Sequence, residues 1–223
     1  MKPRIALIHA TPIAVGPIHA AFARDWPDAD AIDIMDYSLS PDRAQAGEIT
    51  KALSDRILAL AQYGVSTGAQ AVLFTCSAFG SAIDHAAAQI AIPVLKPNEA
   101  MFQAAMQAGD RIAMIYTFPP AAASMEQEFR DEVARTGSNA TLTSILAPGA
   151  IEAARAGDIA THDRLVSQVA KGLTGFDAIT LAHFSTSTAL ASVRAVNATP
   201  TYASPPAAIA KLKSLLCDMP VAV

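Results

Sequence analysis

The chain of 223 residues has few charged side chains, few aromatic ones and only two cysteines. Charged residues make up 16% of the sequence and the formal net charge is −4, with no cluster of Lys and Arg. Nucleic acids and anionic membranes are therefore not expected as partners. No stretch approaches the roughly 20 apolar residues that cross a bilayer. Because Cys76 and Cys217 form no disulfide framework, we expect a protein of the reducing cytoplasm.

Motifs for nucleotide and metal binding are also missing. Neither G-x-G-x-x-G nor G-x-x-x-x-G-K-[ST] occurs in the sequence. Histidines and carboxylates do not pair at the spacing of metal ligands. We therefore expect no metal site, and nucleotide binding has no support from a motif.

The chain does contain an internal repeat with a constant offset. In each matching pair of segments, the second starts 107 residues after the first, without a net insertion. This register makes Cys76 and His183 equivalent positions of two halves. The matching pairs are Arg4–Pro12 (RIALIHATP) with Arg111–Pro119 (RIAMIYTFP), Gly68–Cys76 (GAQAVLFTC) with Gly175–His183 (GFDAITLAH), and Ile92–Val94 with Thr199–Thr201.

The composition agrees with two folded lobes. Apolar residues make up 52% of the chain, enough to bury substantial cores. Each half has about 100 residues, a common domain size. We place the N-terminal lobe at residues 1–107 and the C-terminal lobe at residues 108–223, with the last helix able to pack back on the first lobe. The tail at 218–223 lacks periodicity and is expected to be loose.

Short apolar runs alternate with longer stretches of helical periodicity. Runs such as IALI, AVLF and IAMI are apolar without alternation, which is typical of parallel strands covered on both faces. The order predicts an α/β fold of two pseudo-symmetric, doubly wound lobes, each with a mostly parallel four-stranded sheet flanked by helices. The predicted strands are Arg4–Ala10, Ala31–Met35, Ala69–Thr75, Ile92–Leu95, Arg111–Thr117, Ala140–Leu146, Asp177–Ala182 and Pro200–Ala203. The predicted helices are Ile18–Trp26, Gln45–Tyr63, Ser81–Gln89, Asn98–Ala108, Ala121–Arg135, Ala150–Ala156, His162–Gly172, Thr186–Val196 and Pro206–Leu216.

Reactive side chains gather where the predicted strands end. In open α/β sheets, ligands bind beyond the carboxyl ends of the strands. Cys76 ends a strand and precedes a helix, whose N-terminus would lower the pKa of a thiol and favour the thiolate. A small buried hydrophobic role is the alternative for Cys76. His183 is either a general acid/base or a core or capping histidine. We predict that Cys76 and His183 are the catalytic pair.

Hydroxyl side chains at the same strand ends suit substrate binding. Ser77, Thr117 and Ser185 lie at junctions between loops and helices, where they can bind a carboxylate beside backbone amides. Helix capping alone would also explain them. Thr11, beyond the first strand, is grouped with them as a substrate-binding candidate.

The remaining histidines and a tyrosine divide into two groups. His9 and Tyr116 end equivalent strands, where they could orient a substrate, donate a proton or simply close the strand. We include both among the substrate-binding candidates. His19, His85 and His162 lie in helical stretches and are interpreted as ordinary surface or packing residues.

Four segments together resemble the aspartate/glutamate racemase superfamily, which includes amino-acid racemases, hydantoin racemase, maleate isomerase and arylmalonate decarboxylase. They are IALIHATP, GAQAVLFTCSAFG, IPVLKPNEA and GFDAITLAHFSTST, and the resemblance covers nearly the whole chain. It implies a cofactor-independent enzyme in which two cysteines flank the α-carbon of the substrate. Cys76 matches the first cysteine, whereas His183 stands at the position of the second.

This departure from the superfamily pattern bears on the reaction. A Cys/His pair can exchange protons but lacks the symmetry of two thiols. The decarboxylase branch uses its cysteine at the second-half position, where this chain has His183, and maleate isomerase also has a cysteine there. The opening turn HATPIAVG has no acidic residue where glutamate racemases carry an aspartate, so a specific glutamate activity is not expected.

These observations predict a cofactor-independent racemase or isomerase. Its substrate would be a small carboxylate-bearing carbon acid, an amino acid or a relative of one, held in the cleft between the lobes. Cys76 and His183 would carry the acid–base chemistry. The alternatives are a decarboxylase or lyase of the same superfamily and a non-catalytic carboxylate-binding protein. A homodimer is compatible with a chain of this kind.

Overall fold

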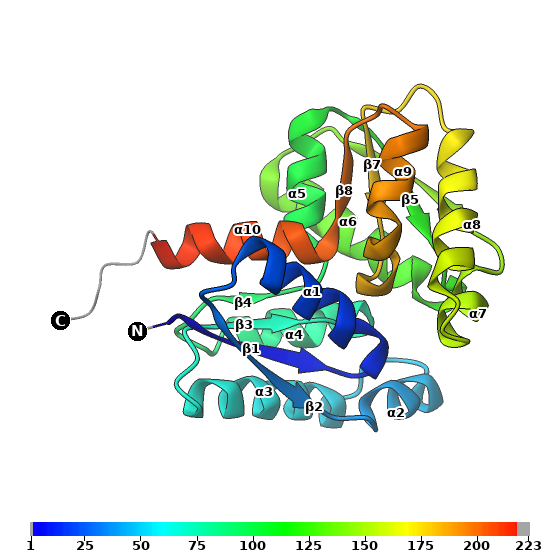
Figure 1. Cartoon of the computed structure of the whole chain (residues 1–223). Coiled ribbons are helices and arrows are strands. Elements are labelled where there is room, and N and C mark those ends of the chain that lie inside the picture. The colour runs from blue at the N-terminus through cyan, green and yellow to red at the C-terminus, as the bar shows by residue number, and fades with distance from the viewer. Residues whose placement is uncertain (1, 218–223) are drawn as a thin grey trace. The chain divides into compact units, whose positions relative to one another are not determined.

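The computed structural model of the chain describes residues 2–217 (Figure 1). These residues form two compact units. The first unit contains the residues up to Pro97 and those from Ala208 onward, and the second unit is Asn98–Ala207. The predicted tail at 218–223 lies outside the described residues.

Each unit is built on a four-stranded parallel sheet. The strand order is β2-β1-β3-β4 in the first unit and β6-β5-β7-β8 in the second. All the predicted strands are confirmed, with ends that lie within two residues of the prediction. Their bounds are β1 (Arg4–His9), β2 (Asp30–Met35), β3 (Ala71–Phe74), β4 (Val94–Leu95), β5 (Arg111–Tyr116), β6 (Thr141–Leu146), β7 (Ala178–Leu181) and β8 (Thr201–Ala203).

The helices also follow the prediction in most places. Their bounds are α1 (Val15–Asp25), α2 (Leu39–Ala46), α3 (Lys51–Ser66), α4 (Gly80–Ala87), α5 (Glu99–Ala108), α6 (Ala122–Thr136), α7 (Ala150–Arg155), α8 (Ile159–Lys171), α9 (Leu190–Val196) and α10 (Ser204–Cys217). Short 3₁₀ turns η1 (Pro12–Ala14), η2 (Ser77–Phe79), η3 (Pro119–Ala121) and η4 (Phe184–Ala189) precede α1, α4, α6 and α9.

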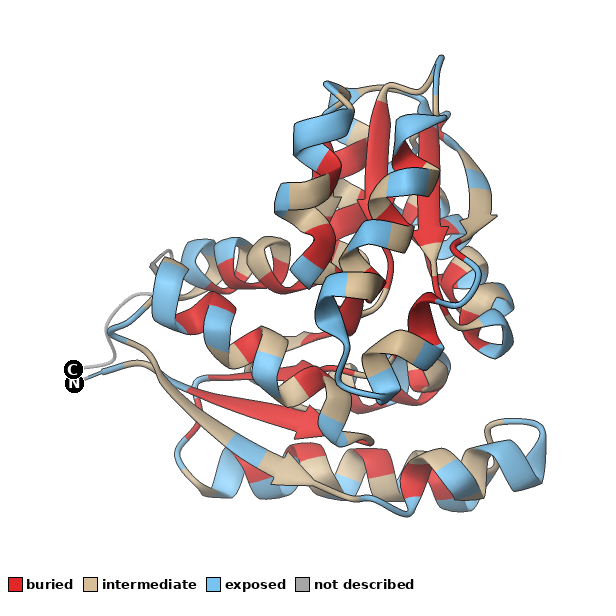
Figure 2. Ribbon diagram, turned by 45° about the vertical axis from the view of Figure 1, so that its right-hand side comes forward, coloured by how far each residue is buried: buried red, intermediate tan, exposed pale blue. Residues whose placement is uncertain are grey.

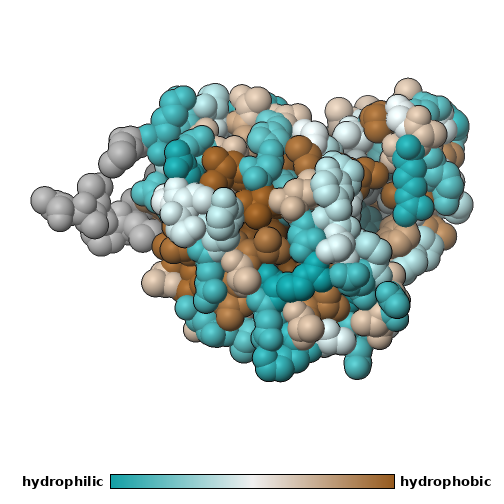
Figure 3. Space-filling view, turned by 90° about the horizontal axis from the view of Figure 1, so that it is seen from below, coloured by the Kyte–Doolittle hydropathy of each residue, from teal (hydrophilic) through white to brown (hydrophobic). Residues whose placement is uncertain are grey.

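The two central strands of each sheet lie in the hydrophobic core of their unit. All four residues of β3 and of β7 are buried, as are most residues of β1 and β5 (Figure 2). Side chains on both faces of these strands pack against helices, which explains their unbroken apolar runs. The edge strand β2 keeps its side chains partly exposed. In the view from below, hydrophobic residues gather toward the middle of the face, with hydrophilic residues around them (Figure 3).

The two units repeat one another in structure as well as in sequence. The strand pairs β1 with β5 and β3 with β7 each start 107 residues apart, and so do the turn pairs η1 with η3 and η2 with η4. The repeat in the sequence therefore corresponds to equivalent strands, each followed by an equivalent 3₁₀ turn, in the two units.

The boundary between the units differs from the predicted division of 1–107 and 108–223. The second unit begins at Asn98 because α5 packs on β7 and β8 of that unit. From Ala208 onward α10 belongs to the first unit, as the expectation of a returning last helix allowed. There the Nζ of Lys213 donates a hydrogen bond to the main-chain oxygen of Asp25 at 3.1 Å.

One predicted helix, Gln45–Tyr63, is wrong in its bounds. Gly47, at φ 72°, ends α2, and α3 begins after Thr50, whose hydroxyl accepts a hydrogen bond from the amide of Leu53 at 3.2 Å. A left-handed residue followed by an N-cap interrupts a helix even where apolar periodicity continues. The first part of the predicted helix Thr186–Val196 is likewise the 3₁₀ turn η4.

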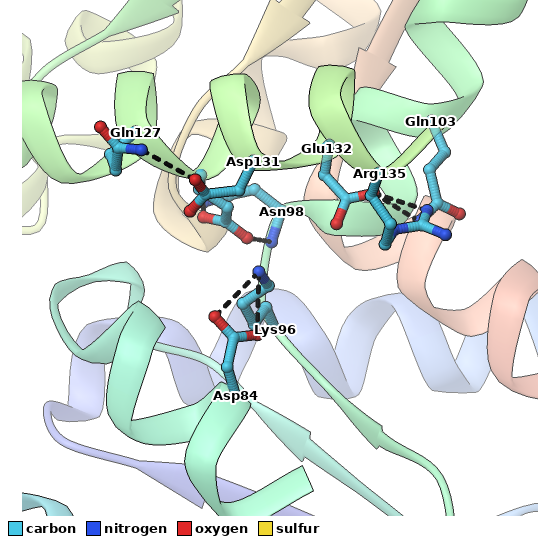
Figure 4. A network of polar contacts seen from close by, with 9 residues as sticks. Asp84, Lys96, Asn98, Gln103, Gln127, Asp131, Glu132 and Arg135 are labelled. Carbon is cyan, nitrogen blue, oxygen red and sulfur yellow. Dashed lines mark hydrogen bonds and ion pairs between the residues drawn. The ribbon is translucent and has the colours of Figure 1, made fainter. Parts of the chain in front are cut away.

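Polar contacts fix the chain on each side of the boundary (Figure 4). In the first unit, the Nζ of Lys96 lies 3.0 Å from an oxygen of Asp84. In the second, the main-chain amide and side-chain Nδ2 of Asn98 donate to the two oxygens of Glu128 at 3.1 and 2.9 Å. Ser204 Oγ donates to Asn98 Oδ1 at 2.7 Å. Asn98 thus ties the start of α5 to α6 and to the start of α10 within the second unit.

Two features are absent from the described part of the chain. No helix there is long and apolar enough to cross a membrane. Among the same residues, no group of three or more His, Cys, Asp and Glu side chains is arranged to hold a metal ion.

Candidate active site

Cys76 lies at the carboxyl edge of the sheet in the first unit, two residues beyond the end of β3. Its backbone is extended, with φ −120° and ψ 121°, and the side chain is half-buried. The thiol has hydrogen-bond partners in the Ala78 amide and the Ser40 hydroxyl. Ser40 Oγ also lies 3.1 Å from the main-chain oxygen of Ala10, so α2 and the end of β1 both influence the position of Cys76.

The predicted thiolate is wrong for this structure. Burial raises the pKa of the Cys76 thiol, and the hydrogen bonds from Ala78 and Ser40 oppose that effect without reversing it. Cys76 is followed by a 3₁₀ turn, and α4 begins only at Gly80, so the helix N-terminus does not meet the sulfur directly. Loss of hydration disfavours the charged form of an acid. At neutral pH Cys76 is therefore a thiol, which is the form of a proton donor.

His9 is fully buried and both of its ring nitrogens are occupied. Nε2 lies 2.9 Å from Asp33 Oδ1, and Nδ1 lies 2.8 Å from Thr75 Oγ1. Because a carboxylate can only accept, Nε2 carries a proton, and the Thr75 hydroxyl can then donate to Nδ1. Burial lowers the pKa of His9, which favours this neutral tautomer. Neither ring nitrogen of His9 is free to bind a ligand. His9 therefore has a structural role, and the prediction that it binds the substrate is not supported.

His19 joins the same network, which the sequence interpretation missed. Its Nε2 lies 2.9 Å from each oxygen of Asp33. Burial works against ionisation of Asp33, but hydrogen bonds from His19 and His9 bring the net pKa of its carboxyl below the usual value. An acidic residue, Asp33, within the otherwise mostly apolar strand β2 is the sequence feature that could have indicated this network.

Of the two predicted hydroxyl residues in the first unit, Thr11 has a capping role and Ser77 does not. Thr11 is the N-cap of η1, where its Oγ1 accepts a hydrogen bond from the amide of Ile13 at 3.2 Å. Ser77 is buried as the first residue of η2, directly after Cys76. Both lie near the carboxyl edge of the sheet, where the sequence placed them.

His183 has the unusual backbone of the second unit. Its φ of 72° makes it the one non-glycine residue with positive φ among the described residues, and its ψ is 145°. A side chain in this region costs on the order of 1–3 kcal/mol, and such strain is concentrated at functional sites. Nε2 of His183 is buried without a hydrogen-bond partner, and burial lowers the pKa of the ring to about 4. His183 is therefore a neutral imidazole at pH 7.

Two hydroxyls near His183 are buried without a partner. They are Oγ1 of Thr117, just beyond β5, and Oγ1 of Thr186 in η4. The parallel pairing of β5 with β7 continues to the amide of Ala182, which donates to the oxygen of Ile115 at 3.0 Å. Thr117 and His183 therefore leave neighbouring strands at the same edge. Buried polar groups are normally paired, so unpaired ones are candidates for a ligand.

The other predicted residues of the second unit occupy the same edge. Tyr116 ends β5 and is half-buried, and Ser185 is buried in η4. Thr186 was not predicted, although its place in the run FSTSTA after the strand could have suggested it. Cys76 with its neighbours belongs to the first unit and His183 with its neighbours to the second.

Residues 10–124 of the chain match the Asp/Glu/hydantoin racemase family, which is more than half of the sequence. The chain belongs to this family. The matched range contains Cys76 and Thr117 and ends before His183. A search of curated proteins by sequence found no match.

Comparison with solved structures shows that this chain has the same fold as racemases of known structure. A glutamate racemase from Francisella tularensis in complex with D-glutamate is 17% identical, with a TM-score of 0.71 over 100% of this chain and 85% of that one. An aspartate racemase from Picrophilus torridus is 16% identical, with a TM-score of 0.70 over 96% and 94% of the two chains. An arylmalonate decarboxylase variant in a sulfate-associated form is 19% identical, with a TM-score of 0.69 over 98% and 95%.

Membership in this racemase family supports an isomerase type of function. At this level of identity, the solved structures establish the fold alone. A decarboxylase stands among the relatives with that fold, so the fold does not select the reaction.

Proposed function

We propose that the protein is a cofactor-independent racemase or isomerase that acts on a small carboxylate-bearing carbon acid, with Cys76 and His183 as its proton-handling pair. One observation carries the proposal. The position equivalent to Cys76 in the other half holds a histidine with a strained backbone and a buried, unpartnered Nε2. Backbone strain of this kind is concentrated at active sites and ligand-binding positions.

The protonation states favour one direction of proton flow. Cys76 rests as a thiol and His183 as a neutral imidazole, because burial raises the pKa of the first and lowers that of the second. His183 would remove the proton from the α-carbon, and the electron pair would pass into the carboxylate as an enediolate. The thiol of Cys76 would then protonate the opposite face of the carbon. The resulting imidazolium and thiolate would return to the resting state by proton exchange with solvent.

The carboxylate of the substrate would be bound by hydroxyl groups at the sheet edges. Thr117 and Thr186 each have a buried hydroxyl with no partner, and Ser77 and Ser185 follow the two catalytic residues. A hydroxyl can donate one hydrogen bond to a carboxylate oxygen. Hydrogen bonds of this kind would strengthen as charge develops on the enediolate.

Proton exchange in D₂O tests the proposal directly. Amino acids, hydantoins and substituted malonates or maleates would be screened by NMR for loss of the α-proton signal. We expect exchange with wild-type protein for a member of one class, none with His183→Gln, and exchange without inversion of the α-carbon with Cys76→Ala. The exposed His85, replaced by Gln, is the matched histidine control and should leave exchange unchanged. Undiminished inversion of the α-carbon in Cys76→Ala would refute the proposed pair.

Decarboxylation is the second candidate, favoured by the resting thiol. A protonated Cys76 could protonate an enediolate formed by loss of CO₂, and an arylmalonate decarboxylase shares the fold. Release of CO₂ from a substituted malonate, without exchange of amino-acid α-protons, would select this candidate over the isomerase.

A further inference from the structure

The strained turn that carries His183 needs support from outside itself. No side chain caps the start of η4, and the contacts within it are short-range. The amide of Thr186 donates to the oxygen of His183 at 3.2 Å, and Ser187 Oγ donates to the oxygen of Phe184 at 2.6 Å. Contacts of this kind close a turn but do not hold it against the sheet. A backbone in a sparsely populated region persists only when surrounding structure determines it.

Asp163 supplies such a contact from α8. Thr188 Oγ1 lies 2.6 Å from Asp163 Oδ1, and 3.2 Å from the main-chain oxygen of Ser185. The hydroxyl has one hydrogen, and the shorter, charge-assisted contact to the carboxylate is the stronger. A side chain near the end of η4 is thus anchored to a neighbouring helix.

His162 holds the carboxylate in place. Its ring is fully buried, and Nδ1 lies 2.7 Å from the same oxygen of Asp163. Since the carboxylate accepts, Nδ1 carries a proton, and Nε2 has no partner among the described residues. Asp163 Oδ1 therefore receives hydrogen bonds from both His162 and Thr188, and its side chain cannot turn away without losing both.

The first half of the chain uses its corresponding helix differently. Cys76 has an ordinary extended backbone and needs no such anchor. There α3 presents Arg56, whose guanidinium binds Asp36 at 2.6 Å and Asp42 at 2.5 Å. These contacts fix α2, which carries Ser40, the hydroxyl partner of the thiol. Each long helix thus supports one reactive position, and only in the second half does it hold the reactive turn itself.

We propose that Asp163 is a positioning residue that acts through Thr188 to keep the 183–189 turn in its strained conformation and the Nε2 of His183 buried. Asp163 does not touch a substrate in this scheme. The inference rests on the proposed function only in taking His183 as the proton-handling group.

Titration of His183 tests the proposal without a known substrate. The protein would be labelled with ¹⁵N-histidine, and the His183 signals assigned by their absence in His183→Gln. We expect a pKa near 4 in wild-type protein. Removal of the anchor in Thr188→Val or Asp163→Ala lets the turn relax toward water, so the pKa of His183 should rise by about one unit or more toward 6.5.

Two matched variants separate positioning from general stability. Thr188→Ser keeps the hydroxyl and should titrate as wild type. Ser167→Ala removes another hydroxyl of α8, one that donates to the oxygen of Arg164 at 2.9 Å, and should also leave His183 unchanged. Thermal unfolding of all variants would be recorded in parallel. If Thr188→Val is destabilised while its His183 titrates with the wild-type pKa, the contact is merely structural and the proposal is overturned.

The outcome is independent of the exchange assay. A raised His183 pKa in Thr188→Val supports the positioning role even if no substrate exchanges its proton. If the protein is active but the pKa of His183 is the same in wild type, Thr188→Val and Asp163→Ala, the proposed function stands. The positioning role of Asp163 is then refuted.

Discussion

The two halves of the chain place different chemistry on equivalent backbones. Cys76 and His183 both follow the third strand of their sheets, and both precede a 3₁₀ turn that leads into a helix. Cys76 sits in a relaxed, extended conformation with hydrogen-bond partners, whereas His183 is strained and its Nε2 has none. The difference shows that the duplicated scaffold fixes where a reactive group stands, while local contacts decide its protonation state.

A second contrast concerns the strand that lies beside each reactive position. In the first half, β1 ends in the buried His9, which joins Thr75 to Asp33 and His19. In the second half, β5 ends in the half-buried Tyr116. In the first half, a polar network includes Thr75, the residue before Cys76. In the second half, the hydroxyls of Thr117 and Thr186 have no hydrogen-bond partner. We interpret the first as a rigid support and the second as the side prepared for a ligand.

The largest expected effect is the loss of activity in Cys76→Ala. Removing a general acid lowers the rate of proton transfer by on the order of 10²–10⁴-fold. Inversion of the α-carbon of a substrate found in the screen would measure it, with far-ultraviolet circular dichroism to show that the fold remains. His183→Gln should show a loss of similar size if the two halves contribute as a pair. A large loss in one variant and none in the other would break the pairing.

The pH dependence of stability sharpens the same comparison. The pKa of His183 is about 4 in the folded protein and near 6.5 in the unfolded chain. Between these two pH values the unfolded chain binds a proton that the folded protein does not, which lowers the free energy of unfolding. This penalty should appear as pH falls below 6.5 and level off below about 4, reaching up to about 3 kcal/mol.

Urea unfolding of wild type and His183→Gln across this pH range would measure that penalty. The difference between the two proteins removes the contribution of His9, whose pKa is lowered in the same sense. A difference that does not change between pH 7 and pH 4 would contradict the buried neutral imidazole.

Removal of His9 should cost more than the matching change in the second half. His9→Phe removes one hydrogen-bond partner from Asp33 and one from Thr75, and we expect a loss of about 2 kcal/mol. Tyr116→Phe, at the equivalent strand end, should cost less than about 1 kcal/mol. Urea unfolding at pH 7 compares the two, and equal losses would remove the contrast between the strand ends.

The smallest effect separates strain from side-chain chemistry. His183→Gly relieves a positive φ and should stabilise the protein by about 1 kcal/mol while abolishing exchange. Cys76→Gly should destabilise it, because φ there is −120° and glycine only adds freedom to the unfolded chain. Thermal unfolding of both variants is the measurement, and destabilisation by His183→Gly would argue against strain at that turn.

The strands and the repeat were predictable because they depend on local apolar patterns. IALI and IAMI form β1 and β5 since residues buried on both faces of a sheet must be apolar. The break between α2 and α3 was missed because Gly47 interrupts a stretch in which the apolar periodicity continues. The role of His9 was missed for a different reason, since its partners Asp33 and Thr75 lie 24 and 66 residues away in the sequence.

Order along the chain was therefore enough to specify two parallel sheets, their equivalence, and the placement of Cys76 and His183 at strand ends. The charge state of those two groups was not available from that order. It depends on burial, on partners such as Ser40, and on a backbone angle that Asp163 and Thr188 help to hold. These are contacts between distant segments, and only the folded chain brings them within hydrogen-bonding range.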